Sequence, residues 1–376
     1  MRVLPCLVLA ALTAVVACSG ADAPDEQDSD GSSGSSGSSG SGPSKDAPDA
    51  SPLVPGQGDA SAAIDGAPSV DGGPGGFTYK PAPAGCVTDV SAGEHTYSCS
   101  TLRVDATIPD LPKTCPAAGC GLILELHGDT GTGPAMDAQL MLRTRGAQRG
   151  YIVLAPTGPA IGTISNVAYP GSTWGPAQDA NLLAIVQSFA AVFKVDPKRV
   201  HVTGFSRGGF TSWRFACDQS NLFASVAVGG AGNGATQLLG GAEATCFENG
   251  RMPARPLDVL LLMGRTDSQY ARIVTARNSA LATYGLAAGD QAVVKQSGTA
   301  FTQTRASKAG KPVVEWFDHA YEIDPTTPGL YAAGKGHCVP GSAVPKTAAY
   351  PVACKPPSGF DWGAEVLAFF DAHRKP

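Results

Sequence analysis

The stretch Arg199-Val-His-Val-Thr-Gly-Phe-Ser-Arg-Gly-Gly-Phe210 decides how this chain folds. Its first residues include β-branched Val and Thr, which predict a short strand. The strand runs into Gly204-Phe-Ser206-Arg-Gly208, and the residues behind it predict a helix. A serine between two glycines at a sharp strand-to-helix turn is typical of a nucleophile elbow, which holds the serine hydroxyl clear of the sheet edge.

Motifs on both sides of the elbow support this interpretation. Because the chain has 47 glycines in 376 residues, a G-x-S-x-G match alone could arise by chance. An apolar strand, Gly121–Leu126, runs into His127-Gly128-Asp129, and a later one, Leu257–Met263, ends at Gly264-Arg-Thr-Asp267. A glycine-rich loop near the end of the chain carries His337. Serine, acid and histidine therefore follow one another in the chain order of an α/β-hydrolase triad.

Strands and helices alternate along the rest of the chain. Apolar runs of strand length predict strands buried on both faces, and amphipathic spacing predicts helices between them. The expected strands are a hairpin within 86–107, then 121–126, 151–155, 200–203, 223–228, 257–263, 302–306 and 313–318; helices are expected up to about 149, at 180–194, up to about 217, after 267 and at 362–373. This alternation predicts an α/β-hydrolase fold, with a mostly parallel central sheet flanked by helices and the site at the carboxyl edge of the strands.

The first 18 residues predict an export signal. Met1-Arg2 precedes the apolar run Val3–Val16, which is too short for a normally flanked spanning helix. The run ends in Val15-Val16-Ala17-Cys18, which resembles the lipobox of bacterial lipoproteins and implies lipid attachment to the Cys18 thiol. An ordinary secretory signal is the alternative. We expect an exported protein, held by lipid at the outer membrane or cell surface of a bacterium, or secreted.

Two further parts follow the signal. Residues 19–76 are rich in Gly, Ser, Pro and Asp and have almost no large apolar side chain. They cannot bury enough surface to fold, so we expect a disordered linker, with a reach of about 40 Å. Residues 77–376 are expected to form one catalytic domain, long enough to bury a substantial core. We expect this domain to be monomeric.

Cysteine usage agrees with export. Of the ten cysteines, Cys6 and Cys18 lie in the signal, which leaves eight in the domain. An even number in an exported chain predicts disulfides. Sequence does not fix the connectivity, but proximity suggests the pairs Cys86–Cys99, Cys115–Cys120, Cys217–Cys246 and Cys338–Cys354. A zinc site at Cys115 and Cys120 is the alternative, but histidines are missing at a usable spacing, and we expect no metal.

Charge and motif content narrow the class of partner. The formal net charge of −5 shows no excess of basic residues. We therefore expect no nucleic-acid partner. No cofactor signature stands in the chain, and we expect no cofactor. The only membrane contact that we expect is through the N-terminal lipid.

The triad residues follow from the chemistry of ester cleavage. Ser206 is the expected nucleophile, and a serine hydroxyl needs an adjacent base to take its proton. We assign the base to His337, because a glycine-rich loop after the last strands is where this triad order places it. Asp267 is expected to orient His337; a helix cap or turn is its alternative role. Asp318 and Asp324 are the reserve acids.

An oxyanion formed during attack needs two fixed donors. One should be the backbone N–H of Arg207, directly after the nucleophile. The other should come from Asp129, with Thr130 as the alternative. We expect the Asp129 carboxylate to point away from the developing anion. Trp174 stands on a loop before a helix, where it could line a substrate cleft or serve only in packing.

These motifs resemble one family. His127-Gly128, the stretch Asp196–Gly209, Gly264-x-x-Asp267 and Gly334-x-Gly-His337-x-x-Pro-Gly341 are similar to secreted polyhydroxybutyrate depolymerases and feruloyl esterases. The resemblance spans nearly the whole domain from Gly121 onward. It implies cleavage of carboxylic esters in a polymer or attached to one. The chain departs from the family pattern after the histidine, where Cys338-Val339 replace the common Thr-Trp, and at Asp129.

Other functions remain open at this point. The ester could belong to a polyhydroxyalkanoate, a feruloylated arabinoxylan or an acetylated polysaccharide, the last being the substrate class of an acetylxylan-type esterase. A peptidase of the same fold is a second enzyme hypothesis. A non-catalytic binding module on a surface tether is the hypothesis from a different class.

Overall fold

The computed structural model describes residues 84–164, 167–232, 246–248, 250–323, 334–341, 353–354 and 360–376. The expected signal with Cys18, and all of residues 19–83, lie outside this range, as does Asp324. By its internal contacts the segment from Asp71 to Pro376 forms one unit. Within the described residues, no helix combines the length and apolar character needed to cross a membrane.

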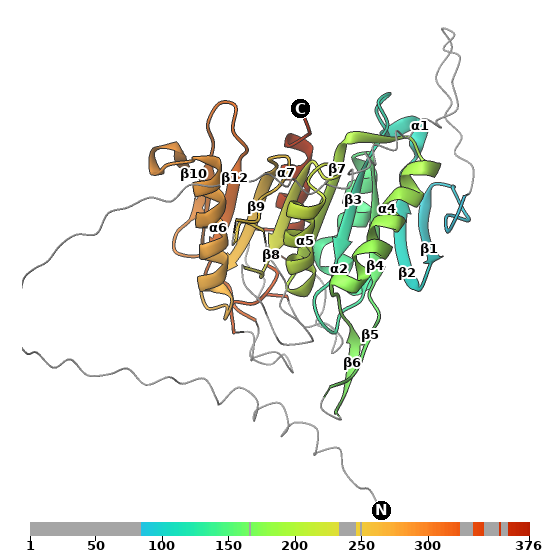
Figure 1. Cartoon of the computed structure of the whole chain (residues 1–376), viewed down its shortest axis with the longest axis horizontal. Coiled ribbons are helices and arrows are strands. Elements are labelled where there is room, and N and C mark those ends of the chain that lie inside the picture. The colour runs from blue at the N-terminus through green and yellow to red at the C-terminus, as the bar shows by residue number, and fades with distance from the viewer. Residues whose placement is uncertain are drawn as a thin grey trace, which may run out of the picture. The chain divides into compact units, whose positions relative to one another are not determined.

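A ten-stranded sheet forms the centre of this unit (Figure 1). Its strands lie in the order β1 (Gly93–Cys99), β2 (Leu102–Ile108), β4 (Tyr151–Thr157), β3 (Cys120–Leu126), β7 (Val195–Phe205), β8 (Ser225–Gly229), β9 (Asp258–Gly264), β12 (Val314–His319), β11 (Phe301–Ala306) and β10 (Gln291–Ser297). The six strands from β4 to β12 run parallel. Antiparallel pairs extend the sheet at both edges. The predicted α/β-hydrolase fold is confirmed.

Helices cover both faces of the sheet and account for two apolar cores. The helices are α1 (Leu111–Thr114), α2 (Gly133–Leu140), α3 (Leu142–Gln148), α4 (Asp179–Val192), α5 (Arg207–Asp218), α6 (Tyr270–Tyr284) and α7 (Trp362–Ala372). Apolar residues of α4, α5 and α6 pack in one core, and those of α2, α3 and α7 pack in the other. Successive side chains of a strand point to opposite faces of the sheet. In β3, Leu122 therefore packs in the first core and its neighbour Ile123 in the second. Burial on both faces explains why the central strands are almost continuously apolar.

Two features were not predicted. The structure adds the edge strand β10, whose residues are mostly exposed and include Val293 and Val294. It also has a small hairpin, β5 (Ala160–Ile164) and β6 (Val167–Ser172), where the sequence predicted only a loop. Figure 1 shows this hairpin projecting beyond the carboxyl end of β4. Because that end of the parallel strands carries the candidate site, the hairpin borders it.

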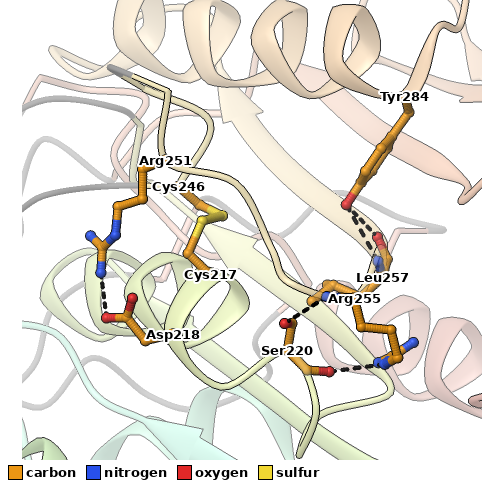
Figure 2. The surroundings of a disulfide bond; sticks show 8 residues. All are labelled: Cys217, Asp218, Ser220, Cys246, Arg251, Arg255, Leu257 and Tyr284. Carbon is orange, nitrogen blue, oxygen red and sulfur yellow. Dashed lines mark hydrogen bonds and ion pairs between the residues drawn. A yellow bond between two sulfur atoms is a disulfide. The ribbon is translucent and has the colours of Figure 1, made fainter. Parts of the chain in front are cut away.

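Four disulfides tie the loops to this framework. The pairs are Cys86–Cys99, Cys115–Cys120, Cys217–Cys246 and Cys338–Cys354, as proximity suggested. Figure 2 shows the Cys217–Cys246 bond at the end of α5, next to an ion pair between Asp218 and Arg251. Two of the bonds therefore fix segments that serve the site: one holds the end of the elbow helix, and the other begins directly after His337. The described residues contain no group of histidines, cysteines and acids that could hold a metal ion.

Candidate active site

Ser206 lies on a strained turn between β7 and α5. Its backbone has φ 54° and ψ −118°, a conformation that non-glycine residues rarely adopt. The turn needs the two flanking glycines, because a Cβ on Gly204 would lie 2.3 Å from the backbone of Gly208, and one on Gly208 would lie 2.1 Å from the carbonyl oxygen of Leu126. The Ser206 N–H donates to the Gly229 carbonyl at 2.8 Å. This local geometry is that of a nucleophile elbow.

The structure brings His337 and Asp267 together. His337 Nδ1 lies 2.8 Å from Asp267 Oδ2, and both residues are buried. The other carboxylate oxygen, Oδ1, accepts the Gln269 N–H at 2.8 Å, so the carboxylate is held on both sides. The approach depends on Gly336, where a Cβ would lie 2.7 Å from the Asp267 nitrogen. A carboxylate in this position fixes the histidine as the Nδ1–H tautomer and leaves Nε2 to act as a base.

His337 also lies beside the elbow. Its ring centroid is 4.9 Å from that of Phe205, the residue before Ser206. A Cβ on Gly230 would lie 3.0 Å from His337 Cε1, and Gly230 directly follows the acceptor of the Ser206 N–H. Residues from β7, the β8 loop and the late glycine-rich loop therefore meet at one place on the sheet edge. Phe205 and Gly230 are site residues that the sequence analysis missed; the positive φ of Gly230 (57°) is the feature that requires glycine there.

The reserve acid Asp318 has other partners. It accepts from Arg265 Nε at 2.6 Å and from the Tyr270 hydroxyl at 3.1 Å. These bonds connect the end of β12 to the loop after β9 and the start of α6. Asp318 is therefore occupied in holding the loop that carries Asp267, and the other reserve, Asp324, lies outside the described residues.

His127 organises the loop after β3 and is not placed to act as a base. Its Nδ1–H donates to the Gly128 carbonyl at 2.7 Å, and its Nε2 accepts the Gly158 N–H at 3.0 Å. This pair of partners requires the neutral ring. Burial lowers the pKa of His127 to about 4. The loop that follows is thus tied to the end of β4 through an uncharged imidazole.

The buried His127 makes an acid-stability prediction. Its pKa is about 4 in the folded chain against roughly 6.5 when unfolded, so its contribution is fully present above the unfolded pKa and is lost as the pH falls toward the folded one. The full loss is about 3 kcal/mol, from 1.36 kcal/mol per unit. We expect the free energy of unfolding by urea to fall more between pH 7 and pH 4 in the wild type than in His127→Gln. Equal pH dependence in the two proteins would show that His127 is not buried neutral; the other buried histidines are common to both.

The loop after β3 carries Asp129 and Thr130, the two residues from which we expect the second oxyanion donor. The Thr130 N–H donates to the Ser172 carbonyl at 2.8 Å, so it is not available as the alternative oxyanion donor. The N–H of Asp129 is then the remaining candidate in this loop. Arg207 begins α5, and the first N–H groups of a helix point outward from its positive end. The Asp129 carboxylate accepts from the Thr173 hydroxyl and faces the Arg207 guanidinium. The negative charge of Asp129 is thus balanced by side-chain partners; its orientation away from the anion stays a prediction.

Trp174 is buried beside His127. Its side chain is buried, with 2% of the residue exposed, and its indole N–H donates to the His127 carbonyl at 2.9 Å. The ring packs against His127 with centroids 4.8 Å apart. So little exposed surface leaves no ring face for a substrate. Of the two roles left open by the sequence, these contacts favour packing: Trp174 supports His127 and the loop that follows β3.

Known proteins similar to this chain are esterases. No family model matches the chain. A segment of 161 residues, 42% of the chain, is 30% identical to feruloyl esterase B of Neurospora crassa and covers 53% of that protein. A segment of 114 residues, 30% of the chain, is 29% identical to acetylxylan esterase A of Aspergillus ficuum and covers 38% of it. The chain thus spans about half or less of the length of these curated relatives.

Solved structures of esterases also resemble the chain. An acetyl xylan esterase from Aspergillus awamori matches 62% of this chain and 92% of its own at 17% identity, with a TM-score of 0.43. A ferulic acid esterase from Anaeromyces mucronatus, solved with ferulic acid, matches 51% of this chain and 79% of its own at 16% identity, with a TM-score of 0.36. In sequence, therefore, part of this chain is similar to part of the feruloyl and acetylxylan esterases.

Proposed function

We propose that the chain is an exported serine esterase that hydrolyses carboxylic esters in a polymer or attached to one. The observation that carries the proposal is the 2.8 Å contact between His337 Nδ1 and Asp267 Oδ2, made beside the strained elbow of Ser206. An acid, a base and a serine from three separate segments converge there. The sequence similarity to feruloyl and acetylxylan esterases supports the same reaction class.

The proposed reaction has two stages. Ser206 Oγ attacks the ester carbonyl carbon while His337 Nε2 takes the hydroxyl proton, and Asp267 stabilises the imidazolium that forms. The carbonyl oxygen becomes an oxyanion held by the N–H groups of Arg207 and Asp129. Collapse expels the alcohol, which receives the proton from His337 and leaves an acyl-Ser206. Water then attacks the acyl group by the same route, releasing the acid and restoring the serine.

The similar proteins support a choice of substrate class. Feruloyl esters and acetylated xylan are the substrates that the names of the relatives indicate. We place these two esters first and polyhydroxybutyrate, suggested by the sequence motifs, after them. All three are bulky, and a chain tethered through a linker at residues 19–76 could reach such a polymer from a surface.

We further propose that Cys18 carries the lipid and that residues 77–376 act as one monomeric catalytic domain. Four disulfides in the described residues support an oxidising, exported environment. Metabolic labelling of the full chain with a radioactive fatty acid tests the anchor. Label in the wild type and none in Cys18→Ala is expected; equal label in both would contradict it.

A substrate panel tests the proposed function. The purified chain, with its disulfides intact, is given methyl ferulate, acetylated xylan, polyhydroxybutyrate and a chromogenic peptide amide. We expect release of ferulate or acetate above the rate of the other two. Cleavage of polyhydroxybutyrate or the amide alone would contradict the substrate class. No hydrolysis of any of them would favour a binding module.

A further inference from the structure

The two residues expected to supply the oxyanion donors are also joined through their side chains. Arg207 Nε lies 3.3 Å from Asp129 Oδ1 and 3.4 Å from Oδ2. The Arg207 side chain is 4% exposed and that of Asp129 is 29% exposed. The Thr173 hydroxyl donates to the same Oδ1. A charged pair and a hydroxyl thus connect the elbow helix, the loop after β3 and the end of β6.

The loop that carries Asp129 needs such support. The next residue, Thr130, has φ 65°, which is unfavourable for a β-branched residue. Its carbonyl oxygen would lie 2.5 Å from a Cβ on Gly171, so the hairpin end packs directly against it. The Ser172 carbonyl accepts the Thr130 N–H at 2.8 Å. Backbone in this conformation persists only where its surroundings hold it, and here the strand β6 provides one side of that support.

The Arg207 guanidinium provides the other side. Arg207 follows the nucleophile in a rigid turn, so its backbone is fixed by the elbow itself. Through its side chain it holds the Asp129 carboxylate, and so sets the distance between the two N–H groups. The same contact neutralises a carboxylate that would otherwise oppose a negative charge forming nearby.

We propose that Asp129, the Arg207 side chain and Thr173 are positioning residues that hold the two oxyanion donors at a fixed separation. This inference rests on the proposed function. The proposed role needs no contact between these three side chains and the substrate. Replacing Asp129 by Asn or Arg207 by Gln leaves the backbone N–H of that residue in place. A change in kcat in these variants therefore reflects a shift in the position of the two N–H donors, because the donors themselves are still present.

Single substitutions test the proposal. We expect Asp129→Asn and Arg207→Gln each to lower kcat for p-nitrophenyl acetate by about ten- to a hundredfold with KM nearly unchanged, less than the roughly 10²–10³-fold of a lost donor. The rate of reaction with a fluorophosphonate should fall in parallel, because phosphonylation also places an oxyanion in the hole. The double variant should be no slower than the slower single variant, since the two groups act as a unit.

One control variant and one pair of substitutions at Thr173 separate positioning from folding. Asp179→Asn weakens a comparable ion pair made by Arg214, which lies about two turns after Arg207 in α5. Arg214 Nε and Nη2 lie 2.6 and 2.7 Å from the carboxylate oxygens of Asp179 in α4. This variant should leave kcat unchanged. Thr173→Val removes the hydroxyl and should slow turnover by about tenfold. Thr173→Ser keeps the hydroxyl and should have a kcat close to that of the wild type. The thermal midpoint of each variant is measured alongside.

The outcomes are distinguishable. A higher kcat in Asp129→Asn together with a lower kcat in Arg207→Gln would mean that the two residues act only through the electrostatic effect of their charges on the oxyanion. That result would overturn the positioning role. Wild-type kcat in both variants, or a rate loss in Asp179→Asn equal to that in Asp129→Asn, would also overturn it. If the wild type itself neither hydrolyses esters nor reacts with the fluorophosphonate, the proposed function has failed, and the inference with it.

Discussion

Replacement of Ser206 by alanine is expected to lower kcat for p-nitrophenyl acetate by about 10⁵–10⁶-fold. The alanine variant has no oxygen to form the acyl intermediate, so only the donors of the oxyanion hole remain to assist attack by water. The elbow itself should persist, because Gly204 and Gly208 provide the close approach that shapes it. Initial rates at saturating substrate, with the disulfides intact, measure the effect.

Ser188→Ala is the matched control for this experiment. Ser188 lies on α4, and its hydroxyl donates to the Ala184 carbonyl at 2.8 Å. Its loss should leave kcat within about twofold of the wild type, as expected for an exposed hydroxyl away from the site. A Ser206→Ala protein that keeps more than a tenth of the wild-type rate would show that another group performs the attack.

Asp267→Asn is expected to lower kcat by about 10⁴-fold, the size of the effect when a triad carboxylate becomes an amide. The carboxylate at 2.8 Å accepts the proton of His337 Nδ1. An amide can present its NH₂ group instead, which favours the other tautomer and places the proton on the nitrogen that must act as the base. KM should change little, because Asp267 is buried.

Asp318→Asn is the comparison that decides between the two acids. It weakens the contacts with Arg265 and Tyr270 but leaves the partner of His337 in place. We expect it to lower the thermal midpoint and to keep most of the turnover. A loss of activity in Asp318→Asn as large as that in Asp267→Asn would remove the distinction between the two carboxylates.

The central sheet could be predicted because its strands are buried on both faces. Runs such as Leu122–Leu126 then have no polar alternation and stand out from the helices. The edge strand β10 lacks this signal, since its residues are mostly exposed.

The buried carboxyl group of Glu125 in β3 could not be predicted. Glu125 is fully buried, and its burial, together with the nearby Asp137 carboxylate, raises its pKa well above the ordinary range. Nothing in the local pattern identifies such a group.

The candidate triad could be predicted from chain order, but its surroundings could not. Order and loop type single out Ser206, Asp267 and His337, because an elbow and a glycine-rich loop have local sequence signatures. The pairing of Arg207 with Asp129 joins positions 78 residues apart, and no spacing rule connects them. Trp174 shows the same limit: its indole N–H reaches the His127 carbonyl across 47 residues, so burial and not the loop position decides its role.

Covalent labelling with a fluorophosphonate tests the central claim most directly. The full chain is treated with the reagent, digested and mapped by mass spectrometry, beside the Ser206→Ala variant. Activated serines react with this reagent and ordinary serines do not. One phosphonyl group per chain at Ser206, and none in the variant, is the predicted result. An unlabelled wild-type chain, or a label on another serine, would contradict the assignment of Ser206 as the nucleophile.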